Sequence, residues 1–189
     1  MNYKELKDYI KSDALITNGY TSNSIRNAIN NYSFQIVFLF RVINYIKQKR
    51  VFLPITCMLK ILFSTLCHIH GITLPICAKI GRGLYMPHYG CVVINDKAQI
   101  GTDAIIMQCV TIGSNWCGNH AGVPTIGDRI IICSNSVIVG NVRIGNNVFI
   151  GAGTIVTKDI PDNSLVMGNP MRIIPNKGLE YNKVYRREK

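Results

Sequence analysis

The sequence predicts a mainly β fold, a hexapeptide-repeat solenoid preceded by an α-helical region, and three observations support this prediction. Large aliphatic residues stand at every sixth position without a miss from Ile126 to Val156. Glycine or another small residue often follows the aliphatic residue, and a small or β-branched residue stands four positions after it. This period is typical of chains in which each hexad forms a short strand and a corner, and three hexads close one triangular coil.

The N-terminal part of the chain has a different composition, since Gly19 is the only glycine before Gly71. The segment from Ser22 to Arg50 starts with serine, ends with basic residues and has apolar residues at three-to-four spacing, which predicts one long helix. Pro54 interrupts the pattern, and Ile55–His70 predicts a second, strongly apolar helix. We therefore expect a helical region over 1–71, a solenoid over 72–175 and a C-terminal tail over 176–189.

The six-residue register extends backwards from Ile126 and slips twice. The first slip falls between Val92 and Ile100, and the second between Ile112 and Ile126. Insertions in a solenoid form loops that leave the prism, and such loops often carry binding residues. We expect the longer insertion, Gly113–Pro124, to protrude. The earlier members of the register are Ile80, Met86, Val92, Ile100, Ile106 and Ile112.

The formal net charge is +11, and it is spread over the whole chain. No nucleic-acid-binding motif accompanies the charge, which argues against a nucleic-acid partner. An anionic cofactor, an anionic substrate or the inner face of a membrane would fit it.

Seven cysteines occur without a CxxC pair, mostly among aliphatic neighbours. We interpret them as small buried hydrophobic residues. Their odd number and the lack of a secretory signal favour a reducing cytoplasm over a disulfide framework, and no metal site is expected.

The stretch Ile61–Ala78 contains no Lys, Arg, Asp or Glu over eighteen residues. This is the lower limit for a membrane span, but His68 and His70 interrupt it. We expect helices that pack on one another or on a trimer partner. The alternative is peripheral contact with a membrane, in which basic residues face the lipid phosphates: Arg41, Lys47, Lys49, Arg50 and Lys60.

Two stretches resemble the hexapeptide-repeat acyltransferases: AKIGRGLYMPHYGCVVINDKAQIG at residues 78–101 and IGAGTIVTKDIPDNSLVMGNPMRII at residues 150–174. More narrowly, they are similar to the serine acetyltransferase-like branch, which includes sugar O-acetyltransferases of surface-polysaccharide pathways. The resemblance covers about residues 72–175. It implies a left-handed parallel β-helix, a homotrimer, and acetyl-CoA as a donor that lies between adjacent prisms.

Transfer of an acetyl group from a thioester to a hydroxyl requires a base, and histidine has a suitable pKa near neutrality. His68 and His70 belong to the apolar segment, where we expect a structural or interfacial role. His88 stands in the repeat and coincides with the general base of the resembled family, whereas His120 lies in the protruding insertion. We expect His88 to be the catalytic base, because a coil fixes geometry better than a loop. A backbone carbonyl or a carboxylate of a neighbouring coil, Asp96 or Asp103, would orient its imidazole.

The remaining site residues fall into two groups. His120, Trp116 and Tyr89 are expected to contact the acceptor, although Trp116 would equally well stack on adenine or pack against a neighbouring subunit. The pantetheine arm of acetyl-CoA needs a flat wall of small residues, and its phosphates need cations. Together with the resemblance, this places the acetyl-CoA contacts at Ser134, Gly151, Ala152, Thr157, Lys158 and Arg172.

Three positions differ from the pattern of serine acetyltransferases. Those enzymes have an aspartate where Thr73 stands, another where Pro87 stands, and a second histidine where Val123 stands. We therefore expect the acceptor to be a sugar hydroxyl in capsule or other surface-polysaccharide biosynthesis. Serine O-acetylation in cysteine biosynthesis is the alternative, and a non-catalytic trimeric scaffold is the alternative of another class.

Overall fold

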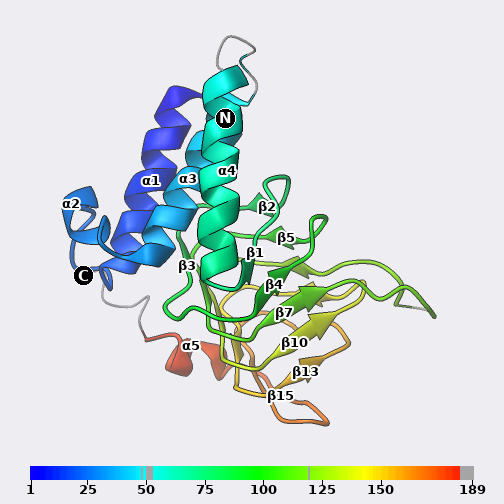
Figure 1. Ribbon diagram of the computed structural model, residues 1–189. Helices are drawn as coiled ribbons and strands as arrows, with labels where there is room; N and C mark the ends of the chain where they lie inside the picture. Colours follow the sequence, from blue (N-terminus) through cyan, green and yellow to red (C-terminus); the bar gives the residue numbers. More distant parts are fainter. Residues whose placement is uncertain (48, 50–52, 119, 184–189) are drawn as a thin grey trace.

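The structure is a computed structural model that describes residues 1–47, 49, 53–118 and 120–183. A group of helices lies on one end of a parallel β-helix, whose coils follow one another away from the helices (Figure 1). The predicted fold class, a left-handed parallel β-helix after an α-helical region, is confirmed. The extent of the C-terminal tail stays a prediction, because residues 184–189 lie outside the described part.

The single long helix predicted over residues 22–50 is wrong, because the chain breaks between α2 and α3. The side chain of Asn31 accepts hydrogen bonds from the backbone N–H groups of Ser33 at 2.9 Å and Phe34 at 3.4 Å, and so starts a new helix. The second predicted helix is present as α4, and within the described residues no helix is long and apolar enough to cross a membrane. The helices are α1 (Tyr3–Thr17), α2 (Ile25–Ala28), α3 (Tyr32–Ile46), α4 (Leu53–Ile69) and, after the β-helix, α5 (Gly178–Tyr181).

Three sheets form the walls of the prism, and the chain passes through sheets A, B and C in turn. Sheet A contains β1 (Ile72–Thr73), β4 (Val92–Ile94), β7 (Thr111–Gly113), β10 (Val137–Val139) and β13 (Ile155–Val156). Sheet B contains β2 (Lys79–Ile80), β5 (Gln99–Ile100), β8 (Thr125–Ile126) and β11 (Arg143–Ile144). Sheet C contains β3 (Leu84–Tyr85), β6 (Ala104–Ile106), β9 (Ile130–Ile132), β12 (Phe149–Ile150), β14 (Leu165–Met167) and the antiparallel β15 (Arg172–Ile174).

The aliphatic ladder forms the core of the prism. Ile126 lies in sheet B, Ile132 in sheet C and Ile138 in sheet A, and all three are buried. The next three members of the ladder, Ile144 to Val156, repeat this order one coil further on. Each hexad therefore moves the chain to the next wall, and we name the corners between walls the A/B, B/C and C/A edges.

The first slip of the register was placed in the wrong segment. Ile94, and not Val92, pairs with Ile112 in sheet A, so the two additional residues lie between Met86 and Ile94. Val92 and Ile94 are both buried, and hydrophobicity alone therefore did not distinguish them. The correction moves the insertion into the corner that contains His88.

The prediction that the cysteines are buried is wrong for four of them. Cys67 is buried, and burial raises the pKa of its thiol to about 11. Burial also raises the pKa of the half-buried Cys133. The exposed thiols are those of Cys57, Cys77, Cys91 and Cys117.

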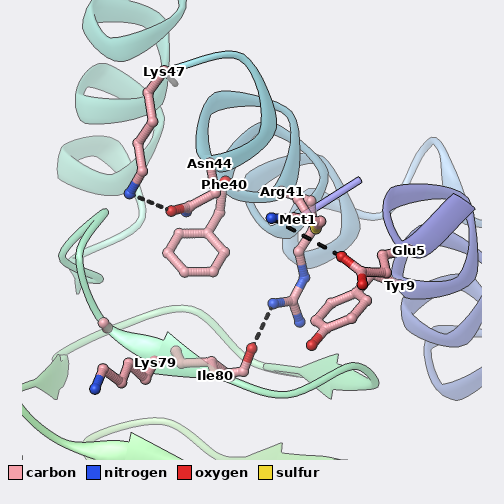
Figure 2. Close-up of a pocket in the computed structure, with 10 residues that line it drawn as sticks. Met1, Glu5, Tyr9, Phe40, Arg41, Asn44, Lys47, Lys79 and Ile80 are labelled. Carbon is pink, nitrogen blue, oxygen red and sulfur yellow. Dashed lines mark hydrogen bonds and ion pairs between the residues drawn. The ribbon is translucent and has the colours of Figure 1, made fainter. Parts of the chain in front are cut away.

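A buried ion pair joins the helices to the first coil. Asp13 of α1 and Arg41 of α3 are 1% and 2% exposed, with Nε and Oδ2 at 2.9 Å. The Arg41 guanidinium also donates to the carbonyl oxygens of Ile80 and Gly81, and Figure 2 shows it directed at Ile80. Arg41 therefore binds the end of the β-helix, and the interpretation that it faces lipid phosphates is wrong.

Candidate active site

His88 lies at the C/A edge of the first coil, with its side chain exposed. The Cys109 N–H donates to the Gly90 carbonyl oxygen, as the Asn135 N–H donates to Gln108 and the Gly153 N–H to Ser134. Gly90 therefore opens a column along the C/A edge that continues through Gln108, Ser134 and Ala152, and His88 lies two residues before Gly90 in the corner that contains the two additional residues. Because neighbouring strands lie about 4.8 Å apart, the backbone of Ala152 is about 14 Å from that of Gly90 along the column.

The backbone after His88 is held from both sides. The Gly90 N–H donates to the His70 carbonyl oxygen at the end of α4, and the Gly90 carbonyl oxygen accepts from the Cys109 N–H, both at 2.9 Å. Tyr89, between them, has an exposed side chain. His88 and Tyr89 thus project into solvent from a backbone fixed by α4 and by the second coil.

An aromatic cluster lies beside His88. The Tyr32 ring stacks on the His70 ring with centroids 4.7 Å apart, and it meets the Tyr89 ring edge-on at 5.4 Å. The Tyr32 hydroxyl donates to the Met86 carbonyl oxygen at 3.1 Å. Burial, with smaller contributions from Tyr85 and Tyr89, raises the pKa of Tyr32 to about 12, so this hydroxyl keeps its proton.

The cluster confirms that His70 packs in the structure, whereas Tyr32 was missed. Tyr32 opens α3, far from His88 in the sequence, and only the packing of α3 on the first coil brings it close. No sequence signal marked it.

Small residues line the part of the C/A edge that is farther from the N-terminal helices. Ser134 and Gly151 are half-buried, and Ala152 is exposed. A Cβ built on Gly153 would meet no atom within 4 Å, so this corner is open to solvent. Arg172 starts β15 opposite Met167, which places it two strands beyond Gly151 on the same edge. The edge therefore has His88 at one end, an open wall of small residues in the middle and a cation at the other end.

The insertion 113–124 projects from the A/B edge, as predicted, in the turn from β7 to β8 (Figure 1). Trp116 is 88% exposed, and its indole Nε1 donates to Ser114 Oγ at 2.8 Å. His120 is also exposed, and its carbonyl oxygen accepts from the Asn141 N–H at 2.9 Å. Both side chains are therefore free to meet a ligand or another subunit.

Thr157 and Lys158 also lie at the A/B edge, because they follow β13 of sheet A. A cavity of about 470 Å³ opens at the same edge between Asp96 and Trp116, and Val123 contributes to its wall. The structure therefore divides the predicted site residues into two groups. His88, Tyr89, Ser134, Gly151, Ala152 and Arg172 share the C/A edge, whereas Trp116, His120, Thr157 and Lys158 share the A/B edge.

Neither carboxylate considered as a partner of His88 lies on its edge. Asp96 is at the A/B edge after β4, and Asp103 is at the B/C edge before β6. Pro87, directly before His88, provides no polar side chain. Within the described residues, no group of three or more His, Cys, Asp or Glu side chains is placed to hold a metal ion.

The repeat and the fold define the class of the protein. The family of bacterial transferase hexapeptide (six repeats) proteins matches residues 124–158. A structure of serine acetyltransferase in complex with CoA has the same fold, with a TM-score of 0.70 and 22% identity, over 91% of this chain and 71% of that one. The chain therefore has the repeat and the fold of the hexapeptide-repeat acyltransferases.

Within this class the chain is similar to serine acetyltransferases. The serine acetyltransferase of Synechococcus elongatus is 32% identical over 146 residues, which are 77% of this chain and 58% of the relative. Soybean serine acetyltransferase complexed with serine superposes with a TM-score of 0.72 at 27% identity, over 90% of this chain and 70% of that one. The chain spans about half the length of the first curated relatives that it matches.

Proposed function

We propose that the protein is an acetyl-CoA-dependent O-acetyltransferase with His88 as its general base. The observation that carries the proposal is the C/A edge, where His88 stands in the first corner and the column of Gln108, Ser134 and Ala152 leads from that corner towards Arg172. The pantetheine arm of acetyl-CoA would lie along Ser134 and Ala152, with its amides facing exposed backbone groups. Arg172 would pair with the phosphates of the donor.

The reaction follows from this placement. His88 removes the proton of the acceptor hydroxyl, and the hydroxyl oxygen attacks the thioester carbonyl carbon. A backbone N–H of the corner stabilises the negative charge on the carbonyl oxygen. The carbon–sulfur bond then breaks, and CoA leaves as a thiolate that takes up a proton. The products are the acetyl ester and free CoA.

The second group of residues would reach the site from a neighbouring subunit. One prism keeps the A/B and C/A edges on opposite sides of sheet A, so Trp116 and His120 cannot approach His88 of the same chain. A closed threefold ring joins unlike surfaces of adjacent subunits, and it would bring the A/B edge of one prism to the C/A edge of the next. We therefore propose a homotrimer, in which Thr157 and Lys158 contact acetyl-CoA bound mainly by the neighbour.

The relatives favour serine as the acceptor over the sugar hydroxyl expected from the sequence. The relatives from Synechococcus elongatus and soybean are serine acetyltransferases, and the soybean enzyme was solved with serine. Serine acetylation, as a step of cysteine biosynthesis, is therefore the first candidate. A sugar acceptor is the second, because Thr73, Pro87 and Val123 provide neither the carboxylates nor the second histidine of serine acetyltransferases.

Release of free CoA thiol from acetyl-CoA tests the proposal. We expect rapid release with serine and only background release with sugars and sugar nucleotides. Rapid release with a sugar and not with serine would support the second candidate. No acceptor-dependent release with either class would contradict an O-acetyltransferase and leave the scaffold alternative.

A further inference from the structure

Cys91 and Cys109 lie beside each other in neighbouring coils of the C/A edge. Val93 pairs with Thr111 in sheet A, and two residues earlier on each strand the same register brings Cys91 next to Cys109. The Cys109 N–H donates to the carbonyl oxygen of Gly90, the residue before Cys91, as in a parallel pair. Neighbouring strands lie about 4.8 Å apart, which is within the range of about 4.4–6.8 Å between the Cα atoms of a disulfide.

The two cysteines have the same backbone conformation. Their φ angles are 52° for Cys91 and 58° for Cys109, both in the left-handed region. Stacked corners of equal conformation direct both Cα–Cβ bonds to the same side of the edge, and rotation about χ1 brings the sulfur atoms towards each other. The Cβ atoms would start about 4.8 Å apart, whereas a disulfide holds them at about 3.5–4.5 Å, so a bridge would draw the two corners together.

The other corners of this column carry the residues that the left-handed region favours. Gly71 stands beside Cys91, Asn135 beside Cys109, and Gly153 one coil further on. Their φ angles are 63°, 60° and 68°. Glycine avoids the steric cost of this conformation, and asparagine tolerates it better than most residues. The geometry of the turn therefore does not account for cysteine at two successive corners.

The pair also differs from the other cysteines in accessibility and position. Cys91 is exposed and Cys109 is half-buried, and the lack of a side chain at Gly71 leaves one side of Cys91 uncovered. The raised pKa values of Cys67 and Cys133 disfavour their reactive thiolates. Among the described residues, Cys91 and Cys109 are the two cysteines that the sheet register places side by side. The other exposed thiols lie in α4, before β2 and in the 113–124 insertion: Cys57, Cys77 and Cys117.

We propose that Cys91 and Cys109 form a redox modification site, which a low-molecular-weight disulfide converts into an intramolecular disulfide. The Cys91 thiolate attacks one sulfur of the small disulfide, so that a mixed disulfide forms and one small thiolate leaves. The Cys109 thiolate then attacks the Cys91 sulfur, closes the bridge and releases the second small thiolate. The two cysteines are oxidised, the small disulfide is reduced, and the two leaving thiolates take up the protons that the cysteines lose.

The bridge would act on the candidate active site, and this consequence rests on the proposed function. His88 precedes Cys91 by three residues in the same corner, and Gly90 and Gln108 lie directly before the two cysteines. Closing the bridge therefore moves the backbone that carries His88, at the point where the proposed column for the pantetheine arm begins. A misplacement of about 1 Å can lower turnover about a hundredfold. Since the donor has to reach this edge, a small disulfide can reach it as well.

Incubation of the reduced full chain with CoA disulfide or glutathione disulfide tests the proposal. Trypsin would release Cys91 in the peptide 83–97 and Cys109, together with Cys117, in the peptide 98–129. We expect mass spectrometry without reduction to find these two peptides joined, in the unchanged protein and in Cys117→Ser. Cys109→Ser should instead keep the small thiol on Cys91 as a mixed disulfide.

The double variant Cys57→Ser with Cys77→Ser is the matched control, because it removes two exposed thiols elsewhere. It should form the same bridge as the unchanged protein. Absence of the Cys91–Cys109 bridge from the unchanged protein would overturn the proposal. Bridges that join other cysteines equally often would overturn it as well.

Release of CoA by the treated protein measures the effect on activity. We expect the bridged form to have a kcat about tenfold to a hundredfold lower, restored by dithiothreitol, and Cys91→Ser to respond little relative to its own reduced form. A bridged form with unchanged kcat would contradict the effect on the active site. Bridge formation needs no acetyl transfer, so a protein that forms the bridge but never releases CoA would contradict the proposed function and leave the modification site in place.

Discussion

Replacement of His88 by alanine is expected to lower kcat for CoA release by about 10²–10⁴-fold, the usual contribution of a positioned general base. The fold should remain intact, because the His88 side chain is exposed at a corner whose backbone is held by Gly90 and by the end of α4. Thiol release under saturating acetyl-CoA and acceptor measures the effect, and circular dichroism with a thermal midpoint checks the fold.

His120→Ala is the matched control for this experiment, since His120 is the other exposed histidine near a predicted binding edge. We expect it to raise KM for the acceptor and to change kcat much less. A His88→Ala variant with unchanged turnover, or a larger loss of kcat in His120→Ala, would end the assignment of His88 as the base.

Replacement of Asp13 by alanine is expected to lower the free energy of unfolding by about 3–5 kcal/mol, because it leaves the buried Arg41 guanidinium without its counter-charge. Asp13 also accepts hydrogen bonds from the backbone N–H groups of Gly83 and Leu84, at 2.8 and 2.9 Å, and these donors would lose their partner. Urea denaturation followed by circular dichroism provides the measurement.

The exposed pair between Asp8 and Arg82 supplies the comparison. Its two side chains are 56% and 49% exposed, and an ion pair in solvent contributes at most about 1 kcal/mol. Asp8→Ala should therefore change the urea midpoint only slightly. If Asp8→Ala and Asp13→Ala lowered the free energy of unfolding equally, burial of the Asp13–Arg41 pair would not add to its contribution to stability, which would contradict this prediction.

The β-helix could be predicted because its core is periodic along the chain. Each ladder residue, such as Ile132, pairs within its sheet with the corresponding residues of the adjacent coils, so a local spacing determines a long-range contact. The exception was Val92, where two buried aliphatic residues two positions apart gave two acceptable registers. Strand pairing with Ile112 resolved the register in favour of Ile94.

The helical region was predicted less well because its contacts are not periodic. Helix α1 was missed, although the capping box of Asn2 and Glu5 marks its start. The Asp13–Arg41 pair joins residues from two helices to a third element, and nothing in the sequence indicated that Arg41 was buried. The same applies to Tyr32, which reaches His88 only through tertiary packing.

For the candidate site, the sequence identified residues but could not assign them to edges. That assignment requires knowing which wall each hexad occupies, and hence where the register slips. With the insertion placed between Met86 and Ile94, His88 falls on the same edge as Ser134 and Ala152, in the corner at the start of their column. The residues of the 113–124 insertion fall on another edge. Only the structure shows that the two groups of residues lie apart in one chain, and hence that a site containing both would need two subunits.

The most direct test of this account is a crystal structure of the protein with bound CoA. The account predicts that the CoA sulfur lies within reach of the His88 imidazole, that the pantetheine arm follows Ser134 and Ala152, and that the phosphates approach Arg172. CoA bound away from the C/A edge, with its sulfur remote from His88, would contradict it.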